Sequence, residues 1–336
     1  MREKIIIIYS MLDRKLNVAP MMEWTDRHCR YLHRLYAPQA LLYTEMLVAA
    51  AVVRGDRQRL LRFDPREMPV ALQLGGSNPQ ELAAAARIGR DVGYAEINLN
   101  VGCPSDRVKN GSFGACLMLK PALVAECVRA MREAVSIPVT VKCRIGIDAR
   151  EDYEFFAEFV EHVVSAGVDA LIVHARNAIL GGLSPKENRE IPPLKYPFVH
   201  RLKQERPKLP VVLNGGLADA AEMKRHVDLG LDGVMVGRAA YHRPEVLTEL
   251  HRLLVDEHFQ GPTAAEVVER MAAYAEQQLR EGVRLHSITR HMHGVAAGRQ
   301  GARAWRRFLS EIAARPEARP ETLISALPII QQGLAA

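Results

Sequence analysis

Eight short apolar segments alternate with helical segments between residues 16 and 236 of this 336-residue chain. The apolar segments are rich in β-branched and aliphatic residues, and their length suits the buried strands of a parallel sheet. The candidate strands are residues 16–19, 41–44, 70–74, 95–99, 139–142, 170–174, 211–214 and 233–236. Amphipathic spacing predicts helices between several of them, at residues 79–92, 120–135, 153–166 and 218–229.

Eight alternating β/α units favour a (β/α)₈ TIM barrel. A doubly wound sheet is the competing architecture, but it would need a GxGxxG motif after an early strand, and the chain has none. Helical patterns then follow at 264–280, after a capping box that begins at Thr263, and at 287–297, 302–314 and 320–332. We therefore expect an irregular N-terminal extension at 1–12, a barrel at 13–250 and a small C-terminal helical bundle at 251–336.

The number and spacing of the cysteines indicate the redox environment of the protein. There are five, an odd number, with no CxxC pair and no Cys/His spacing typical of zinc sites: Cys29, Cys103, Cys116, Cys127 and Cys143. This usage indicates a reducing, cytoplasmic location and no metal site. The isoleucine run at residues 5–8 is far too short to cross a membrane, so no membrane association is expected.

One cysteine lies in a setting that favours chemistry. Cys103 follows an apolar strand in the turn Asn100-Val101-Gly102-Cys103-Pro104-Ser105, whereas Cys127 lies inside an apolar periodic segment, as a structural cysteine normally does. A loop thiol becomes functional only with a partner or a cofactor on which to act. Other residues of the chain must therefore provide that partner or bind that cofactor.

Small and polar residues close most of the candidate strands, at the end where barrels build their active sites. They are Pro20, Met21, Glu45, Gln73, Asn98, Asn100, Cys103, Lys142, Arg144, His174, Asn214, Gly215, Gly216, Gly237 and Arg238. Glycine turns after strands seven and eight expose backbone N–H groups where such barrels hold a phosphate, although simple chain reversal would also explain them. With Gln73, Lys142 and His174 around the mouth, the pattern suits a flavin mononucleotide, FMN.

The charge distribution indicates an anionic partner. The formal net charge is +6, and no Asp or Glu occurs between residues 282 and 310. That stretch instead contains Arg284, His286, Arg290, His291, His293, Arg299, Arg303, Arg306 and Arg307. Trp305 and Phe308 are interleaved with the arginines, which suits stacking on nucleic acid; a solvated basic helix face is the alternative.

The chain resembles the tRNA-dihydrouridine synthases over nearly its whole length after the first dozen residues. The motifs that carry the resemblance are Val18-Ala19-Pro20-Met21, Leu99-Asn100-Val101-Gly102-Cys103-Pro104-Ser105, Val141-Lys142-Cys143-Arg144-Ile145-Gly146, His174-Ala175-Arg176, Asn214-Gly215-Gly216 and Met235-Val236-Gly237-Arg238. Residues 181–194 and 288–292 resemble the A subfamily, which modifies positions 20 and 20a of the tRNA D-loop.

The resemblance implies FMN as the bound flavin, NADPH as the reductant, Cys103 as general acid and tRNA as the partner. The residues implied to bind FMN are Pro20, Met21, Met22, Gln73, Lys142, His174, Asn214, Gly215, Gly216, Gly237 and Arg238. Contacts to tRNA are implied for Asn100, Lys186, Arg189, Arg303 and Arg306, and we expect Arg144 to orient the base together with Asn100. A monomeric protein is expected.

The chemistry of uracil explains why a thiol would be needed. Hydride transfer from flavin N5 to C6 creates an enolate, and a thiol on the opposite face of the base would protonate C5. Two alternatives remain open. A barrel enzyme that reduces a free pyrimidine or another small enone leaves the basic stretch without a purpose, whereas a non-catalytic tRNA-binding module or RNA chaperone leaves the strand-end residues unexplained.

Overall fold

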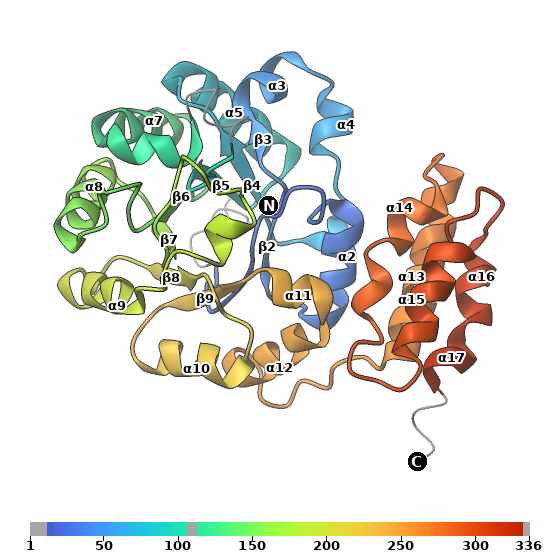
Figure 1. Ribbon diagram of the computed structural model, residues 1–336. Helices are drawn as coiled ribbons and strands as arrows, with labels where there is room; N and C mark the ends of the chain where they lie inside the picture. Colours follow the sequence, from blue (N-terminus) through green and yellow to red (C-terminus); the bar gives the residue numbers. More distant parts are fainter. Residues whose placement is uncertain (1–11, 106–112, 332–336) are drawn as a thin grey trace.

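The computed structural model describes residues 12–105 and 113–331, whose centre is a closed parallel β-barrel (Figure 1). The strands are β1 (Leu16–Val18), β2 (Leu41–Tyr43), β3 (Leu47–Val48), β4 (Val70–Gly75), β5 (Glu96–Val101), β6 (Val139–Arg144), β7 (Ala170–His174), β8 (Val211–Asn214) and β9 (Gly233–Val236). The hydrogen-bonded order is β2-β1-β9-β8-β7-β6-β5-β4-β3, and pairing of β2 with β4 closes the barrel. The expected (β/α)₈ barrel is confirmed.

The short strand β3 was not expected. It pairs with the end of β4, Leu47 opposite Leu74, while β2 pairs with the beginning of β4, Leu42 opposite Val70. The second barrel strand is therefore interrupted at residues 44–46, where the Thr44 hydroxyl accepts a hydrogen bond from the backbone N–H of Gln73 (3.0 Å). This interruption brings Met46 to the wall of the cavity described below.

Helices surround the barrel and fill the connections between its strands. They are α2 (Arg27–Tyr36), α3 (Ala49–Arg54), α4 (Arg57–Leu61), η1 (Pro65–Glu67), α5 (Pro79–Val92), η2 (Gly114–Leu119), α7 (Pro121–Ala134), α8 (Tyr153–Ser165), η3 (Glu187–Arg189), α9 (Tyr196–Glu205), α10 (Ala220–Asp228), α11 (Arg238–His242) and α12 (Glu245–Leu254). The four predicted barrel helices are present with ends shifted by at most two residues.

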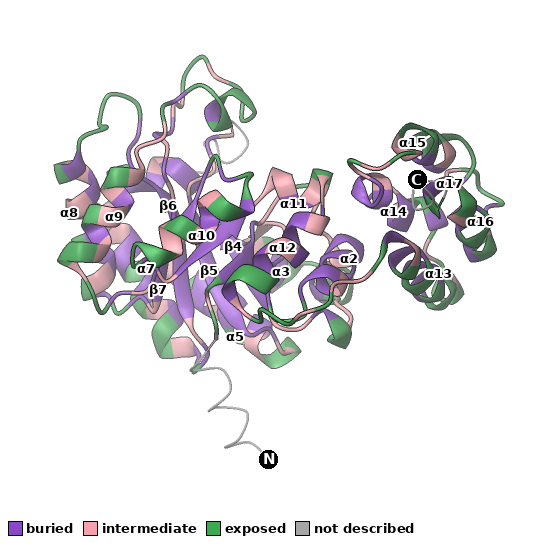
Figure 2. Ribbon diagram, turned by 90° about the horizontal axis from the view of Figure 1, so that it is seen from below, coloured by how far each residue is buried: buried purple, intermediate pink, exposed green. Residues whose placement is uncertain are grey.

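The barrel has two separate cores because side chains alternate along each strand. On β5, Ile97, Leu99 and Val101 belong to the layer shared with the helices. The interior contains a smaller apolar cluster of Ala19, Leu41, Tyr43, Ala71, Ile172, Val212 and Met235. The burial colours of Figure 2 show the buried strands enclosed by helices whose outer faces are exposed. The remaining interior side chains of β5 are polar, and they lead to the site.

The C-terminal region is helical, as expected. It comprises α13 (Ala264–Arg280), α14 (Leu285–Thr289), η4 (Met292–Gly294), α15 (Ala302–Glu311), α16 (Pro320–Ser325) and α17 (Leu327–Gln331). The predicted capping box of Thr263 and Glu266 begins α13. Two of the predicted helices are divided: 287–297 into α14 and η4, and the described part of 320–332 into α16 and α17. Residue 332 and nearly all of the predicted N-terminal extension, 1–12, lie outside the described residues.

The division after α14 falls where the chain contacts the barrel. Arg290 Nη2 and His291 Nε2 both contact Oδ2 of Asp26, at 2.7 and 2.9 Å. The segment that follows α14 is therefore tied to the barrel through one carboxylate. Asp26 also caps α2 by accepting from the N–H groups of His28 and Cys29.

The helical region lies beside the barrel next to α2, and α13 and α14 contact that helix (Figures 1 and 2). Helix α12, in contrast, packs against β1, α2 and α10 and so belongs to the barrel wall. Among the described residues, no helix combines the length and the apolar character that crossing a membrane requires.

Candidate active site

A cavity of about 720 Å³ opens at the carboxyl ends of the barrel strands, a size typical of cofactor and small-molecule sites. Every residue expected to bind the flavin lines it, together with Cys103. From the sequence-predicted set these are Pro20, Met21, Met22, Gln73, Cys103, Lys142, His174, Asn214, Gly215, Gly216, Gly237 and Arg238. Residues from most of the barrel strands therefore meet in one place. Asn100, Arg144 and Arg189 lie in the same wall.

The turn after β8 strongly favours glycine at its two central positions. Gly215 and Gly216 have φ angles of +105° and +72°, a region that side chains rarely adopt. A Cβ atom on Gly215 would lie 2.4 Å from Cδ2 of His174, and one on Gly216 would lie 2.5 Å from Cδ1 of Leu194. This turn keeps backbone exposed in the cavity, which is what an anion such as a phosphate requires.

Arg238, at the start of α11, lies close to this turn but is already paired. Its Nη1 atom is 2.5 Å from Oε1 of Glu190, and both side chains are partly exposed. A phosphate bound here would share Arg238 with Glu190 or displace that carboxylate.

Lys142 and His174 provide polar groups in the cavity wall. Lys142 Nζ donates a hydrogen bond to Oδ1 of Asn214 (2.9 Å), and burial together with the nearby Arg144 charge lowers the pKa of Lys142 to about 8. Burial and the surrounding cations hold the pKa of His174 well below its usual range. The buried Nε2 atom of His174 has no hydrogen-bond partner among the described residues. An orphaned polar atom in a cavity wall is suited to a ligand.

The half-buried Cys103 lies in a loop that is held by hydrogen bonds. Asn100 Oδ1 accepts from the backbone N–H groups of Gly102 (3.1 Å) and Cys103 (3.0 Å). The Cys103 carbonyl accepts from the N–H of Ala115 (2.9 Å), and its Sγ atom lies 3.4 Å from Oγ of Ser105. The backbone position of the thiol is therefore set by Asn100.

The other cysteines have different surroundings. Cys29, Cys127 and Cys143 are completely buried, and burial raises the pKa of Cys127 to about 12. Cys116 donates a hydrogen bond to the Phe113 carbonyl. Among the cysteines, Cys103 is the one that lines the cavity. In the described part of the chain, no cluster of three or more His, Cys, Asp or Glu side chains could hold a metal ion.

Arg144 is held by backbone carbonyls at the edge of the cavity. Its Nε donates to Gly102 (3.0 Å), and its Nη1 donates to Asn177 (2.8 Å) and Asn188 (2.9 Å). Burial lowers the pKa of Arg144 to about 10. It thus holds the Cys103 loop through the Gly102 carbonyl, whereas Asn100 holds it through two backbone N–H groups.

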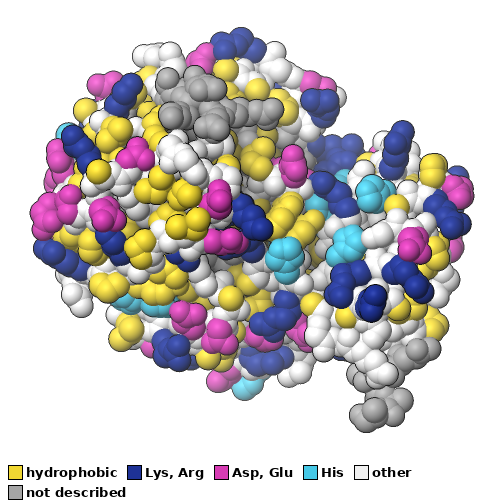
Figure 3. Space-filling view, viewed as in Figure 1, with side chains coloured by type: hydrophobic (Ala, Val, Ile, Leu, Met, Phe, Trp, Pro, Cys, Tyr) yellow, Lys and Arg dark blue, Asp and Glu magenta, His cyan; other side chains and the backbone are white. Residues whose placement is uncertain are grey.

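The remaining predicted tRNA contacts lie outside the cavity. Lys186 is exposed next to η3, and Arg303 and Arg306 are exposed on α15. Figure 3 shows Lys and Arg side chains gathered over the helical region. Two arginines of the predicted basic stretch are paired within the protein, Arg290 with Asp26 and Arg299 with Glu245.

The expectation that Trp305 stacks on nucleic acid is wrong. Trp305 is completely buried, and its Nε1 donates to the Met292 carbonyl (2.8 Å). Trp305 therefore belongs to the apolar core of the helical region. Its spacing from Arg303 and Arg306 reflects an amphipathic helix, with arginines on the outer face and the tryptophan on the inner one.

The residues of the cavity wall that sequence reasoning missed include Trp24, Met46 and His242. Trp24 stacks on Tyr241 with ring centroids 4.3 Å apart, and its ring meets His242 edge-on. The available signal was positional: Trp24 lies three residues after Met21 of the predicted turn, and His242 lies one helical turn after Arg238.

The fold and the cavity together define a (β/α)₈ barrel enzyme whose site is built from the carboxyl ends of its strands. The sequence model of the dihydrouridine synthase family matches residues 17–330, and the chain belongs to this family. Its members are flavin-dependent oxidoreductases that reduce uridine to dihydrouridine in tRNA. The expected family and enzyme class are confirmed.

Curated relatives match over nearly the whole chain. A tRNA-dihydrouridine(20/20a) synthase of Xanthomonas campestris is 57% identical over 304 residues, covering 90% of each protein. A protein of the same name from Synechocystis is 54% identical over 312 residues, covering 93% of each. Among solved structures, a 2-naphthoyl-CoA reductase matches with a TM-score of 0.53 at 10% identity, over 72% of this chain and 53% of that one. That likeness supports the barrel fold alone.

Proposed function

We propose that this protein reduces uridine to 5,6-dihydrouridine at positions 20 and 20a of the tRNA D-loop, with FMN as its flavin and NADPH as the reductant. The curated relatives carry the name of this activity. The observation that carries the proposal is the cavity that joins the Cys103 thiol, the Gly215-Gly216 turn and His174, whose Nε2 has no hydrogen-bond partner in the described part of the chain.

The residues of the cavity fit FMN. The turn of Asn214, Gly215 and Gly216, with Gly237 and Arg238, would hold the phosphate. Lys142 would place a positive charge beside the ring, and Gln73 and His174 would hydrogen-bond to its edge, while Pro20, Met21 and Met22 form apolar wall. The bound flavin supplies the hydride that adds to C6 of uracil.

Cys103 is the proposed general acid. Its thiol gives a proton to C5 of the base as the hydride arrives at C6, which completes the saturated bond. Asn100 and Arg144 would orient the base, since both hold the Cys103 loop and both line the cavity. The uridine must leave its stack to reach this depth, at a cost of a few kcal/mol.

Basic residues at the rim of the cavity and outside it are the proposed contacts to tRNA phosphates. Arg189 lines the cavity and Lys186 follows the lining residue Pro185. Arg303 and Arg306 lie on the exposed face of α15 within the proposed tRNA-binding part, residues 251–336. The last two pair with no acidic side chain among the described residues. Unpaired surface arginines are available for phosphates.

The proposal is tested with FMN-loaded protein, NADPH and tRNA that lacks dihydrouridine. We expect dihydrouridine at positions 20 and 20a by nucleotide-resolved mass spectrometry, and none with free uridine. Protein that cannot be loaded with FMN, or that reduces free pyrimidines as fast as tRNA, would refute the proposal. NADH in place of NADPH tests the reductant separately.

A further inference from the structure

A continuous chain of hydrogen-bonded side chains runs through the interior of the barrel from β5 and β6 to the Cys103 loop. Thr140 Oγ1 donates to Oε1 of Glu96 and accepts from Nδ2 of Asn98 (2.8 Å). Asn98 Oδ1 accepts from Nε2 of Gln73 (2.8 Å), and Gln73 Oε1 accepts from Nδ2 of Asn100 (2.9 Å). We call these five residues the lumen chain. All are buried.

The groups at the two ends of the lumen chain determine which side-chain atoms along it donate hydrogen bonds and which accept them. At the lower end, the Glu96 carboxylate offers acceptors to Thr140, to the Tyr43 hydroxyl (2.9 Å) and to Arg14 Nη1 (2.6 Å). At the upper end, the backbone N–H groups of the Cys103 loop can only donate, so Asn100 must present its oxygen to them. Every amide between the ends then has a single orientation that satisfies all its neighbours.

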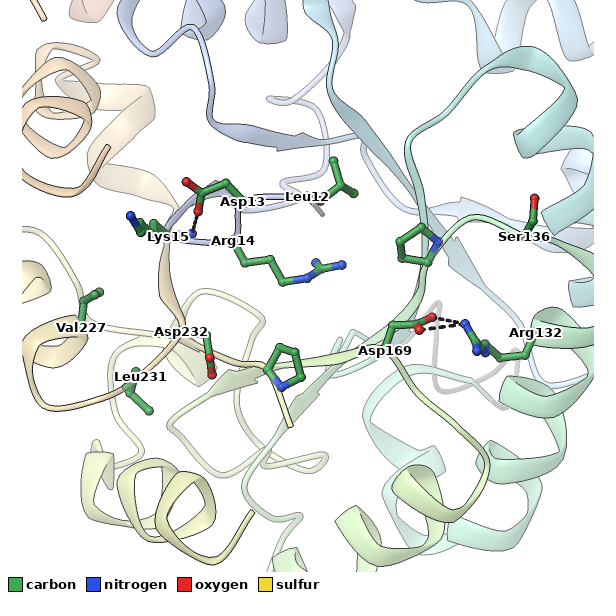
Figure 4. A pocket seen from close by; sticks show the side chains of 12 residues that line it. Leu12, Asp13, Arg14, Lys15, Arg132, Ser136, Asp169, Val227, Leu231 and Asp232 are labelled. Atoms are coloured by element: carbon green, nitrogen blue, oxygen red, sulfur yellow. Dashed lines mark hydrogen bonds and ion pairs between the residues drawn. The ribbon is translucent and has the colours of Figure 1, made fainter. Parts of the chain in front are cut away.

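The lower end is anchored at the face of the barrel opposite to the active site. A second cavity, of about 650 Å³, opens there, and Arg14 lies in its wall with its side chain extended across the barrel opening (Figure 4). The side chains of Arg14 and Glu96 are 9% and 0% exposed. A buried ion pair of this kind is rarely a large source of stability, but it can specify one arrangement of polar groups.

We propose that Glu96 is a positioning residue: it sets the amide orientations of Gln73 and Asn100 and thereby places Cys103 for proton transfer. The inference rests on the proposed roles of Cys103 and Gln73. The side-chain NH₂ groups of Gln73 and Asn100 each use one N–H within the lumen chain and keep a second N–H outside it. Both residues line the active-site cavity. The lumen chain therefore decides that these amides present donors, and not acceptors, to whatever the cavity binds.

A Glu96→Gln substitution keeps the shape of the side chain nearly unchanged, but it replaces one acceptor oxygen with a donor NH₂ group. It therefore tests the direction of hydrogen-bond donation along the lumen chain. If the new amide turns its N–H toward Thr140, the Thr140 hydroxyl loses its acceptor. When that hydroxyl donates to Asn98 instead, the amides of Asn98, Gln73 and Asn100 reverse. The Asn100 NH₂ group would then face the donating N–H groups of the Cys103 loop. If the amide turns its N–H toward Arg14, two donors meet at the anchor instead.

The decisive test is a pair of substitutions at the next link. Thr140→Val keeps the shape and removes the hydroxyl that joins Glu96 to Asn98, whereas Thr140→Ser keeps the hydroxyl. Arg14→Gln is the control for Glu96→Gln, because it breaks the same ion pair and leaves the carboxylate as an acceptor. All variants are studied as FMN-loaded protein, and rates are expressed per bound flavin.

Two measurements are compared. Hydrogen exchange of the Gly102 and Cys103 amides should quicken about tenfold or more in Thr140→Val and Glu96→Gln, and stay near the wild-type rate in Thr140→Ser and Arg14→Gln. Single-turnover oxidation of the reduced protein by tRNA should slow by up to about 10²-fold in the first two variants, because small misplacements of reacting groups are costly. Reduction by NADPH should change little.

The outcomes separate this inference from its premises. Equal exchange rates and equal tRNA oxidation rates in Thr140→Val and Thr140→Ser would overturn it, as would Glu96→Gln behaving like Arg14→Gln. If wild-type protein forms no dihydrouridine, the proposed function fails, while the exchange measurement still decides whether Glu96 orders the loop.

Discussion

The sulfur of Cys103 is the single atom on which the proposed proton transfer depends. Replacing Cys103 with Ala should leave FMN binding and NADPH oxidation nearly unchanged, since neither needs the thiol. Uridine reduction should slow by about 10²–10⁴-fold, the usual effect of losing a general acid. Single-turnover oxidation of reduced protein by tRNA measures this step alone. Cys116→Ala, a neighbouring half-buried cysteine, is the control, and a wild-type rate in Cys103→Ala would exclude the thiol from the mechanism.

Lys142 links flavin binding to pH. Because burial and Arg144 lower its pKa to about 8, the side chain is charged at pH 7 and loses its charge as the pH rises through about 8. Its attraction for negative charge on the reduced ring should therefore be present below this pH and fade above it. Lys142→Met should weaken binding of reduced FMN by about 10–100-fold at pH 7, the value of a hydrogen bond to a charged group, and by little at pH 9.5.

The lowered pKa of Lys142 has the opposite consequence for the stability of the flavin-free protein. The unfolded lysine has a pKa of about 10.4, so between about pH 8 and that value the unfolded state binds more protons and stability rises with pH. Below pH 8, flavin-free Lys142→Met should then be at least as stable as the wild type. Thermal unfolding with and without FMN distinguishes the two effects, and a variant that loses stability and flavin equally would contradict both.

At the scale of elements, the turn after β8 should be intolerant of any side chain. Gly215→Ala places a Cβ against the His174 ring at a positive φ angle, and a left-handed conformation alone costs about 1–2 kcal/mol. We expect FMN affinity to fall at least tenfold with the fold preserved. Gly181→Ala is the control, because a Cβ atom at that position would have no neighbour within 4 Å among the described residues. Fluorescence titration of FMN into both variants decides the matter, and equal affinities would remove the turn from the phosphate site.

Elements with strong local signals were predicted well from the sequence. Helix α5 has the predicted bounds because Asn78 caps it, Pro79 begins it and Gly93 ends it in a left-handed conformation. The carboxyl ends of the strands were predictable for a similar reason, since topology alone brings them together. The glycine turns and Cys103 could therefore be found without coordinates.

Features that depend on distant partners were not predictable. The interruption of the second barrel strand arises where Thr44 meets the backbone of Gln73, and the break after α14 arises where Arg290 and His291 reach Asp26. The prediction for Trp305 was wrong because its neighbours in the sequence are exposed arginines, whereas its indole N–H donates to Met292 in another element. Nothing near Arg238 in the sequence indicates its ion pair with Glu190.

At the scale of the whole molecule, Asp26 joins the barrel to the helical region. Burial alone would raise its pKa, but hydrogen bonds and charges from His291, His28 and Arg290 hold the pKa well below its usual range. A carboxyl group of this kind stabilises the native state above its unfolded pKa of about 3.9, and the stabilisation is lost as the pH falls toward the native pKa. Asp26→Asn should therefore lower the melting temperature more at pH 7 than at pH 3. An effect independent of pH would mean that helix capping is its only role.

The outer face of α15 either binds RNA or is simply a solvated helix surface, and its arginines distinguish the two. Replacing Arg303 and Arg306 with Ala should weaken tRNA binding and reduce the slope of log K against log salt by at most about two units, because each lost phosphate contact releases about one counterion fewer. Flavin content and NADPH oxidation should remain at wild-type levels, since both arginines lie outside the cavity. Dihydrouridine formation should fall and recover in part at high tRNA concentration.

The matched control is the double substitution of Arg87 and Arg129, which are exposed on α5 and α7. Both helices lie away from α13–α17 (Figure 1). This double substitution removes the same charge from the protein, so it accounts for any effect of net charge alone. If both double variants bind tRNA with the same affinity and salt slope, the two arginines of α15 make no specific contact. The RNA path must then run over the cavity mouth, where Lys186 and Arg189 provide the next exposed positive charges.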